Sequence, residues 1–397
     1  MIERLLARLP RGDRALAWLG ILLGLLAFWI ALPPVMVRTP IASILIGLVA
    51  IGLGVYAATR GVRRLGWGAV AVGILGIALG YLATRSGVGN LEQVVVWSAL
   101  TAAMLRYATP LAFAAMGGIF SERSGVVNIG LEGMMIAGAF FGILGADKLN
   151  SWPLGLLCAA VAGASFALVH AFFAIHLRAD QIVVGTAVIF LALGVTGYLF
   201  VDIYGGEGTP PDIPEIPDVH LGFLQDWYFV GPILGQLNLM IWLAFLTIVA
   251  TWVVFFKTPI GLRIRAVGEH PRAADTVGIS VYKTRYAAVT LSGILAALGG
   301  AYLSIGFVNS FNQNMTAGRG FIALAAVIFG NWRPWGAAAA VLLFGFSSAL
   351  AQRLATYSES AQVLFQALPY VLTLIAVAGV IGRSIPPAAS GRPYKKQ

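Results

Sequence analysis

Long apolar runs separated by short polar gaps extend along almost the whole chain. A helix needs about 20 mostly apolar residues to cross the hydrocarbon core of a membrane, which allows the spans to be counted. Candidate windows lie near residues 17–36, 41–59, 67–84, 93–118, 125–146, 152–176, 182–202, 232–256, 286–308, 318–330, 335–355 and 363–382. The pattern therefore predicts an all-α, polytopic membrane protein with about 12 transmembrane helices.

Two of these windows depart from a simple span. The window at 318–330 is too short to cross straight and predicts a broken or re-entrant segment. The window at 93–118 is long and contains Pro110, so we expect a kinked helix or two pieces there.

Composition supports the same class of protein. The 397 residues are 59% hydrophobic and 11% charged, whereas an ordinary soluble domain is about 25% charged. A water-soluble fold of this size could not bury so much apolar surface, which excludes a soluble enzyme and a disordered chain. Cys158 is the single cysteine, which excludes an internal disulfide and a multi-cysteine metal site. We expect no metal, no cofactor and no catalytic residues.

The net charge of +10 is unevenly distributed. If the N-terminus is cytoplasmic and every window crosses, twenty Lys and Arg residues fall in the inside gaps and five in the outside gaps. Cytoplasmic loops of membrane proteins carry such an excess of cations, so the charge indicates a membrane rather than a nucleic acid as partner. We expect a multi-pass protein of the plasma or inner membrane with both termini cytoplasmic.

Two gaps are longer than mere connectors, and long loops are often functional. The gap at 203–231 is acidic and falls outside, where it is either a solvated linker or a docking or lid surface. The gap at 257–285 is basic and falls inside. Its centre predicts a short helix, because Pro271 suits a first turn and Gly278 a stop. A polar helix of this length would lie on the headgroups or insert into another protein.

Ionisable residues within the spans suggest functional sites. Glu132 lies four residues after Asn128, so in a continuous helix the two would share a face. Glu132 is either satisfied locally by Asn128 and facing backbone groups, or lines a path and binds a polar solute. A proton relay is a weaker alternative, because the carboxylate has no evident intramembrane cationic partner.

A second polar cluster follows the window at 286–308. Amides beside Phe311 suit a solute with hydroxyls and a flat ring, although an Asn-rich turn needs no ligand. Gln181 at the inner mouth of another window is ambiguous in the same way. The candidate pathway residues are Asn128, Glu132, Gln181, Phe311, Asn312 and Asn314.

Four ordered motifs are more specific: SERSGVVNIGLEGMM, RADQIVVGTA, GLRIRAVGEHPRAADTVGI and MTAGRGFIALAAVIFGNWRPWG. Together they resemble permease subunits of bacterial ABC importers for nucleosides and simple sugars, within the branched-chain amino acid and ribose permease superfamily. The resemblance implies a type II importer fold, a separate cytoplasmic ABC ATPase, an extracytoplasmic substrate-binding lipoprotein and a second, non-identical permease. It also implies that a coupling helix contacts the ATPase through Gly268, Glu269, His270, Pro271, Arg272, Ala273 and Ala274.

The resemblance begins near residue 100 and sets the expected organisation. We expect an N-terminal extension with three helices over 1–90, a permease core over 91–383 and a cytoplasmic tail over 384–397. The chain has no GxxxxGK[ST] motif, so ATP would be hydrolysed elsewhere. The predicted function is a translocation pathway for a small polar solute, most simply a nucleoside. A sugar importer, an ion- or proton-coupled secondary transporter and, less readily, an intramembrane enzyme are the alternatives.

Overall fold

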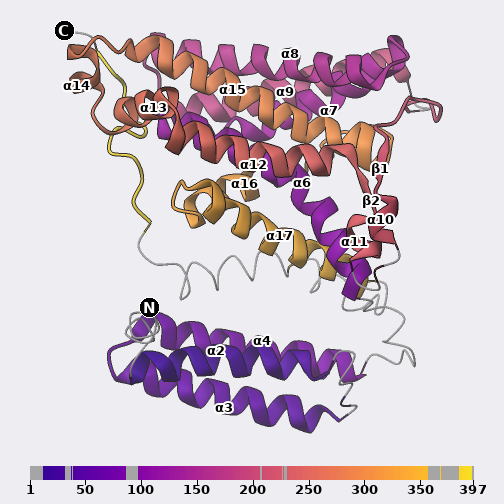
Figure 1. Cartoon of the computed structure of the whole chain (residues 1–397), viewed down its shortest axis with the longest axis vertical. Coiled ribbons are helices and arrows are strands. Elements are labelled where there is room, and N and C mark those ends of the chain that lie inside the picture. The colour runs from indigo at the N-terminus through magenta and orange to yellow at the C-terminus, as the bar shows by residue number, and fades with distance from the viewer. Residues whose placement is uncertain are drawn as a thin grey trace. The chain divides into compact units, whose positions relative to one another are not determined.

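The computed structural model describes residues 12–31, 37, 39–85, 97–205, 208–225, 227, 230–355, 367 and 384–395. Most of these residues lie in long α-helices (Figure 1). In the described part of the chain, eight helices are long and apolar enough to cross a membrane. The all-α, polytopic class is thereby confirmed, whereas the count of twelve spans is not. The window at 363–382 lies, apart from residue 367, outside the described residues.

The chain divides into two compact units, one of residues 1–100 and 347–383 and the other of residues 101–346 and 384–397. In the first unit, α2 (Asp13–Trp29), α3 (Pro40–Thr59) and α4 (Arg63–Arg85) pack on one another. Close approach is possible because small residues meet: a methyl group added at Gly66 would lie 2.6 Å from the Gly54 carbonyl oxygen. Large apolar side chains remain exposed around this bundle, as expected for a surface that faces lipid.

The second unit, here called the core unit, contains the remaining helices apart from the first turn of α6 and the end of α17. In chain order the long elements are α6 (Trp97–Arg123), α7 (Leu131–Lys148), α8 (Trp152–Ala171), α9 (Gln181–Tyr204), α12 (Leu239–Lys257), α15 (Val281–Ala301) and α17 (Pro334–Ala355). The short elements are β1 (Asp218–His220), α10 (Gly222–Gln225), α11 (Gly231–Leu234), β2 (Gln236–Asn238), α13 (Pro259–Glu269), α14 (Pro271–Thr276) and α16 (Arg319–Phe329). π-helical turns, η1 (Phe172–His176) and η2 (Tyr302–Val308), extend α8 and α15.

Helices α7, α8 and α15 pack extensively against one another in the core unit. Almost every residue of α7 from Leu131 to Ala146 is buried. Small residues allow the contact, because Gly138 lies against the backbone of Ala297 and Gly163 lies against the backbone of Gly293. Lipid tails are as apolar as the helix surfaces, so the hydrophobic effect does not drive membrane helices together. Close packing of backbones at small residues supplies the attraction instead.

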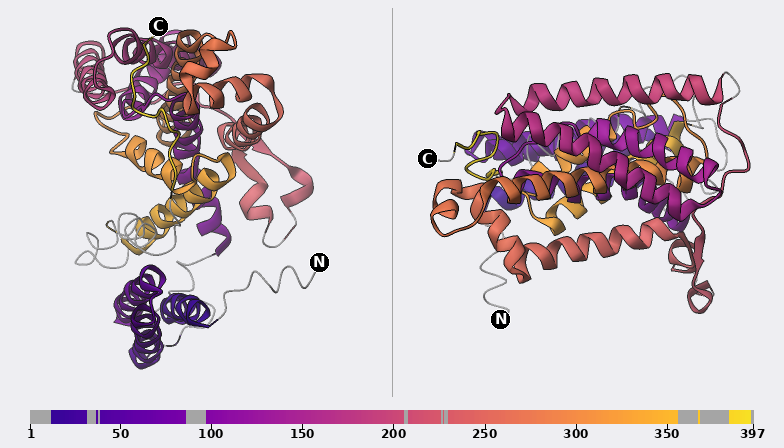
Figure 2. Two further views of the ribbon diagram at one scale, coloured as in Figure 1. Left: turned by 90° about the vertical axis from the view of Figure 1, so that its left-hand side faces the viewer. Right: turned by 90° about the horizontal axis from the view of Figure 1, so that it is seen from above.

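The long helices of the core unit run side by side between two ends (Figures 1 and 2). One end carries the antiparallel pair β1–β2 with α10 and α11 and is called the hairpin end. The other carries α13, α14 and the chain's last described residues and is called the α14 end. The two ends correspond to the gaps at 203–231 and 257–285.

The structure settles both unusual windows. The described part of the window at 93–118 lies in one helix, α6, which begins at Trp97 and contains Pro110. Of the two alternatives predicted there, a kinked helix or two pieces, the second was therefore wrong. Pro110 has no N–H to donate within the helix, which membrane helices tolerate. Beside it, the Thr109 hydroxyl donates to the Leu105 carbonyl (2.8 Å). The window at 318–330 contains the 11-residue α16, which confirms that the helix there is too short to cross a membrane straight.

Candidate functional site

Glu132, the second residue of α7, is buried and lies at the start of α16. Its Oε1 accepts hydrogen bonds from the Thr316 hydroxyl (2.6 Å) and from the Gly318 backbone N–H (2.8 Å). Its Oε2 accepts one from the Gly320 N–H. The first N–H groups of a helix have no partner within it, and a carboxylate there also meets the positive end of the helix dipole. Glu132 therefore caps α16 from another helix.

Glu132 has a partner different from the one expected. Asn128 lies in the loop before α7, which begins only at Leu131, so the two residues do not share a helix face. The Asn128 side-chain amide instead donates to the Ser292 hydroxyl of α15 (3.1 Å) and approaches the Met134 sulfur (3.5 Å). The expectation that Asn128 helps to satisfy Glu132 was wrong, while facing backbone groups do satisfy it.

The segment before α16, residues 309–318 and here called the re-entrant segment, leads from the hairpin end to Glu132. Near its start, the Asn309 side-chain amide donates to the Glu215 carboxylate (2.8 Å). The Phe311 N–H donates to the Thr209 hydroxyl (3.3 Å). Helix α16 then runs about 16 Å, roughly half of a bilayer core. The tenth window, 318–330, is thus a helix of about half the length of a span, and an irregular segment precedes it.

The re-entrant segment has a buried anchor and an exposed stretch. Phe311 is only 2% exposed, and its ring packs edge-to-face on Phe140 and Phe200, with centroids 5.2 Å apart in both pairs. The expected stacking surface for a solute is therefore covered, because Phe311 fixes the segment to α7 and α9. Asn312, Gln313 and Asn314 are exposed directly after it.

Gln181 lies at the α14 end, and its side chain is buried and hydrogen-bonded within the protein. Its Oε1 accepts the Val127 N–H (2.7 Å), and the His170 Nε2 bonds the Val127 carbonyl from the other side (3.2 Å). A carbonyl only accepts, so Nε2 must carry the proton. Gln181 and His170 therefore clamp the loop before α7, and Gln181 is not an open mouth residue.

The predicted short helix in the basic loop is confirmed as α14, with Pro271 in its first turn and Gly278 after it at φ 84°. Ala274 is buried, while Arg272 and Ala273 are exposed. Gly268 packs directly on the Arg123 carbonyl, where no side chain would fit.

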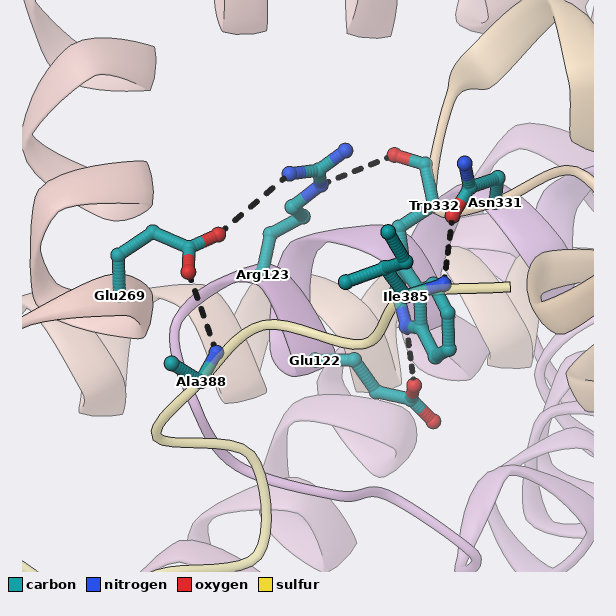
Figure 3. Close-up of polar contacts among 7 residues, drawn as sticks. All are labelled: Glu122, Arg123, Glu269, Asn331, Trp332, Ile385 and Ala388. Carbon is teal, nitrogen blue, oxygen red and sulfur yellow. Dashed lines mark hydrogen bonds and ion pairs between the residues drawn. The ribbon is translucent and has the colours of Figure 1, made fainter. Parts of the chain in front are cut away.

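Glu269 begins a polar network that joins α13 to α6 (Figure 3). Its carboxylate lies 4.0 Å from the Arg123 guanidinium at the end of α6. Arg123 in turn donates through Nε to the Trp332 carbonyl (3.0 Å), and the Trp332 indole N–H donates to Glu122. The turn between α16 and α17 is thereby fixed to α6 and, through Arg123, to the base of α14.

Several of these contributors could not be identified as functional from the sequence. Glu122 and Trp332 lie inside the recognised motifs SERSG and NWRPWG, yet nothing local shows that they meet across 210 residues. The part of the chain that the structure describes contains no cluster of three or more His, Cys, Asp or Glu residues able to hold a metal.

We expect Gly320→Ala to destabilise the cap. A methyl group there would lie 2.6 Å from the Cα and N of Glu132, which only a backbone shift can relieve. The melting temperature of the purified protein should fall by several degrees, for a cost of about 1–3 kcal/mol. Gly194→Ala on α9 meets only open space and is the matched control. Equal melting temperatures for the two variants would contradict this packing.

Comparison of the amino-acid sequence with known proteins identifies the family of this chain. Residues 100–377 match the model of a family described as the permease component of the branched-chain amino acid transport system. No solved structure matches the chain significantly.

Individual relatives cover most of the chain. A guanosine ABC transporter permease protein, NupQ of Bacillus subtilis, is 44% identical over 326 residues, which are 77% of this chain and 99% of that protein. A nucleoside ABC transporter permease protein, NupC of Lactococcus lactis, is 40% identical over 78% of this chain and 99% of its own length. A putative glucose ABC transporter permease protein, TsgC13 of Haloferax volcanii, is 34% identical over 63% and 76%. Each of the two bacteria also has a second, more distant nucleoside or guanosine permease that matches, at 25% and 23% identity.

Proposed function

We propose that this chain forms half of the pathway of an ATP-driven nucleoside importer, because it belongs to the family of permease components of the branched-chain amino acid transport system. The observation that carries the proposal is the broken span, an irregular segment and a half-helix in a protein built of membrane-spanning helices. Nucleosides are the proposed solutes because the relatives at 44% and 40% identity are named as guanosine and nucleoside permeases.

The re-entrant segment supports a pathway at this place. Non-helical backbone at membrane depth is tolerated only where protein buries it or where it lines a water-filled cavity. Phe311 is buried but Asn312 and Asn314 are exposed, so the exposed stretch would line the cavity. Amide side chains both donate and accept, which suits ribose hydroxyls and the heteroatoms of a base.

The network at the α14 end supports an ATPase as the energy source. Helix α14 offers an exposed face, and its base at Gly268 and Glu269 is fixed to the end of α6. The same network holds the turn that follows α16, and the other end of α16 is held by Glu132. Movement of α14 by a cytoplasmic ATPase would therefore reach the re-entrant segment as a shift of packed helices.

The hairpin end would then face outward and receive an extracytoplasmic substrate-binding lipoprotein. It exposes the acidic residues Asp212, Glu215 and Asp218, together with Phe223 (74%) and Trp227 (59%). Exposed aromatic side chains with charges at the rim are typical of protein–protein contacts. In this orientation the C-terminal residues at the α14 end would be cytoplasmic. For the N-terminus the charge distribution alone supports the cytoplasmic side.

A second, non-identical permease would complete the pathway. The nucleoside and guanosine permeases of Lactococcus lactis and Bacillus subtilis each match this chain as two proteins, one close and one distant. The expected extension over residues 1–90 precedes the family match, and we propose it as an addition to the shared permease core.

The test is uptake by right-side-out membrane vesicles of the host cell, loaded with ATP and given tritiated guanosine. We expect uptake that requires internal ATP, that excess unlabelled nucleosides compete with and that an ionophore leaves unchanged. Uptake that an ionophore abolishes and that needs no ATP would indicate a secondary transporter. Competition by glucose but not by nucleosides would indicate a sugar importer, which the relative TsgC13 keeps as the second candidate.

Substitution of the exposed amides tests the position of the pathway. We expect Asn312→Ala, and separately Asn314→Gly, to raise the KM for guanosine by about fivefold through loss of one hydrogen bond. Glycine is chosen because Asn314 has φ 58°, which glycine adopts without strain. Gln236→Ala, an exposed amide on β2, is the control. An unchanged KM in both variants would place the pathway elsewhere.

A further inference from the structure

The chain's last described residues form an irregular segment with a turn, and other parts of the core unit bind it at several points. We call residues 384–395 the C-terminal strap. Its first contact is the Ile385 N–H, which donates to the Asn331 side-chain oxygen (3.1 Å) in the turn between α16 and α17. The Ala388 N–H then donates to the Glu269 carboxylate (3.2 Å), and the Ala389 N–H donates to the Gly268 carbonyl (2.9 Å). The strap therefore touches the base of α14 and the end of α16 within five residues (Figure 3).

The end of the strap completes the buried side of α14. Tyr394 is 6% exposed and packs with Val267, Ala274 and Val281. Burial, and after it the hydrogen bond to the Asp275 carboxylate, raise the pKa of Tyr394 above its usual value. Helix α14 has only six residues, and a helix so short is not stable without tertiary contacts. Tyr394 supplies part of those contacts.

Arg285 binds the strap from the first turns of α15. It is 1% exposed and donates to the Ser124 carbonyl (3.2 Å) and to the Arg392 carbonyl of the strap (3.2 Å). Among the described residues no carboxylate pairs with this guanidinium. Loss of the strap would leave a buried cation with one acceptor fewer, which is costly in a poorly hydrated place.

The contacts close a ring of segments at the α14 end. Arg123 joins α6 to Glu269, Glu269 joins the strap, and the strap returns through Ile385 to the turn at Asn331 and Trp332, which binds Arg123 and Glu122. Without the strap, two of the contacts between α6 and the base of α14 remain. They are the packing of Gly268 on the Arg123 carbonyl and the Arg123–Glu269 ion pair, which is partly exposed and 4.0 Å long. A partly exposed ion pair contributes little by itself.

We propose that the C-terminal strap positions α14, so that force applied to α14 is transmitted to α6 and α16 rather than lost in local movement. Tyr394 and the backbone of Ala388 and Ala389 are the positioning groups. The inference rests on the proposed function, in which an ATPase acts on α14. It assigns a role in energy coupling to residues that the family match, which ends at residue 377, does not include.

The experiment compares Tyr394→Ala, Tyr394→Phe and a chain truncated after Arg383 in right-side-out vesicles loaded with ATP. The readout is tritiated guanosine taken up per ATP hydrolysed, with the amount of permease in the membrane measured in parallel. We expect Tyr394→Ala to lower this ratio by about tenfold while hydrolysis continues. Tyr394→Phe removes only the hydroxyl that bonds Asp275 and keeps the ring contacts that hold α14, so its ratio should stay within about twofold of wild type. Lys395→Ala, exposed on the strap, is the control.

Three outcomes separate the proposals. A wild-type ratio for Tyr394→Ala and for the truncated chain would overturn the positioning role. If the truncated chain fails to reach the membrane, the comparison between Tyr394→Ala and Tyr394→Phe tests the positioning role. Equal losses in the two variants would show that the hydroxyl alone is needed, which would contradict packing of the ring as the cause. Uptake without ATP in the unsubstituted protein would instead reject the proposed function itself.

Discussion

Replacing Glu132 by alanine should abolish uptake. Three donors, the Thr316 hydroxyl and the N–H groups of Gly318 and Gly320, would lose their acceptor in a buried place. Each unsatisfied donor costs about 1–3 kcal/mol, so the capped arrangement should lose about 3 kcal/mol or more. This corresponds to at least a hundredfold decrease in the equilibrium constant for that arrangement. The re-entrant segment would then no longer be held at the start of α16.

Stability measurements distinguish a cap from a solute ligand. We expect both the melting temperature and the uptake of Glu132→Ala to fall. The melting temperature of Glu132→Gln should fall less, because the amide oxygen still accepts a hydrogen bond. It should still fall, because the amide NH₂ faces groups that are themselves donors. Asp212→Asn, an exposed acid of the hairpin end, should change neither quantity. Lost uptake with an unchanged melting temperature would show that Glu132 acts on the solute and not on α16.

Replacing Glu269-His270-Pro271 by Gly-Ser-Gly should abolish ATP-dependent uptake while the permease still inserts in the membrane. The change removes the carboxylate that binds Arg123 and the Ala388 N–H, and it removes the proline that begins α14. The two glycines each add backbone freedom of about 1 kcal/mol at the base of α14. The spans themselves are untouched, so the loss should lie in coupling.

The measurement is guanosine uptake and membrane content in the same vesicles. Arg263→Ser, an exposed cation of α13, is the control and should keep at least half of the uptake. If the triple replacement kept wild-type uptake with the same dependence on ATP, α14 would not be the contact with the ATPase. A permease missing from the membrane would instead show that the segment is needed for assembly.

The two largest predictions differ in how far the sequence anticipated them. Glu132 was identified from its charge inside an apolar window, and α14 was identified from Pro271, Gly278 and the cations around it. Their partners were not: Asn128 was expected beside Glu132 and lies in a loop instead. Phe311 and Gln181 were expected on the pathway and are instead buried anchors. The strap was expected only as a tail.

The membrane class, the approximate positions of the described long helices, the half-length of α16 and the presence of α14 could all be predicted from the amino-acid sequence. Each of these depends on residues close together in the chain, because a span must be apolar along its own length and satisfy its own backbone hydrogen bonds. Which polar groups meet depends instead on packing between segments that are distant in the chain. Glu132 and Thr316 are 184 residues apart, and only the packing of α7 against α16 brings the carboxylate to the helix start that needs it.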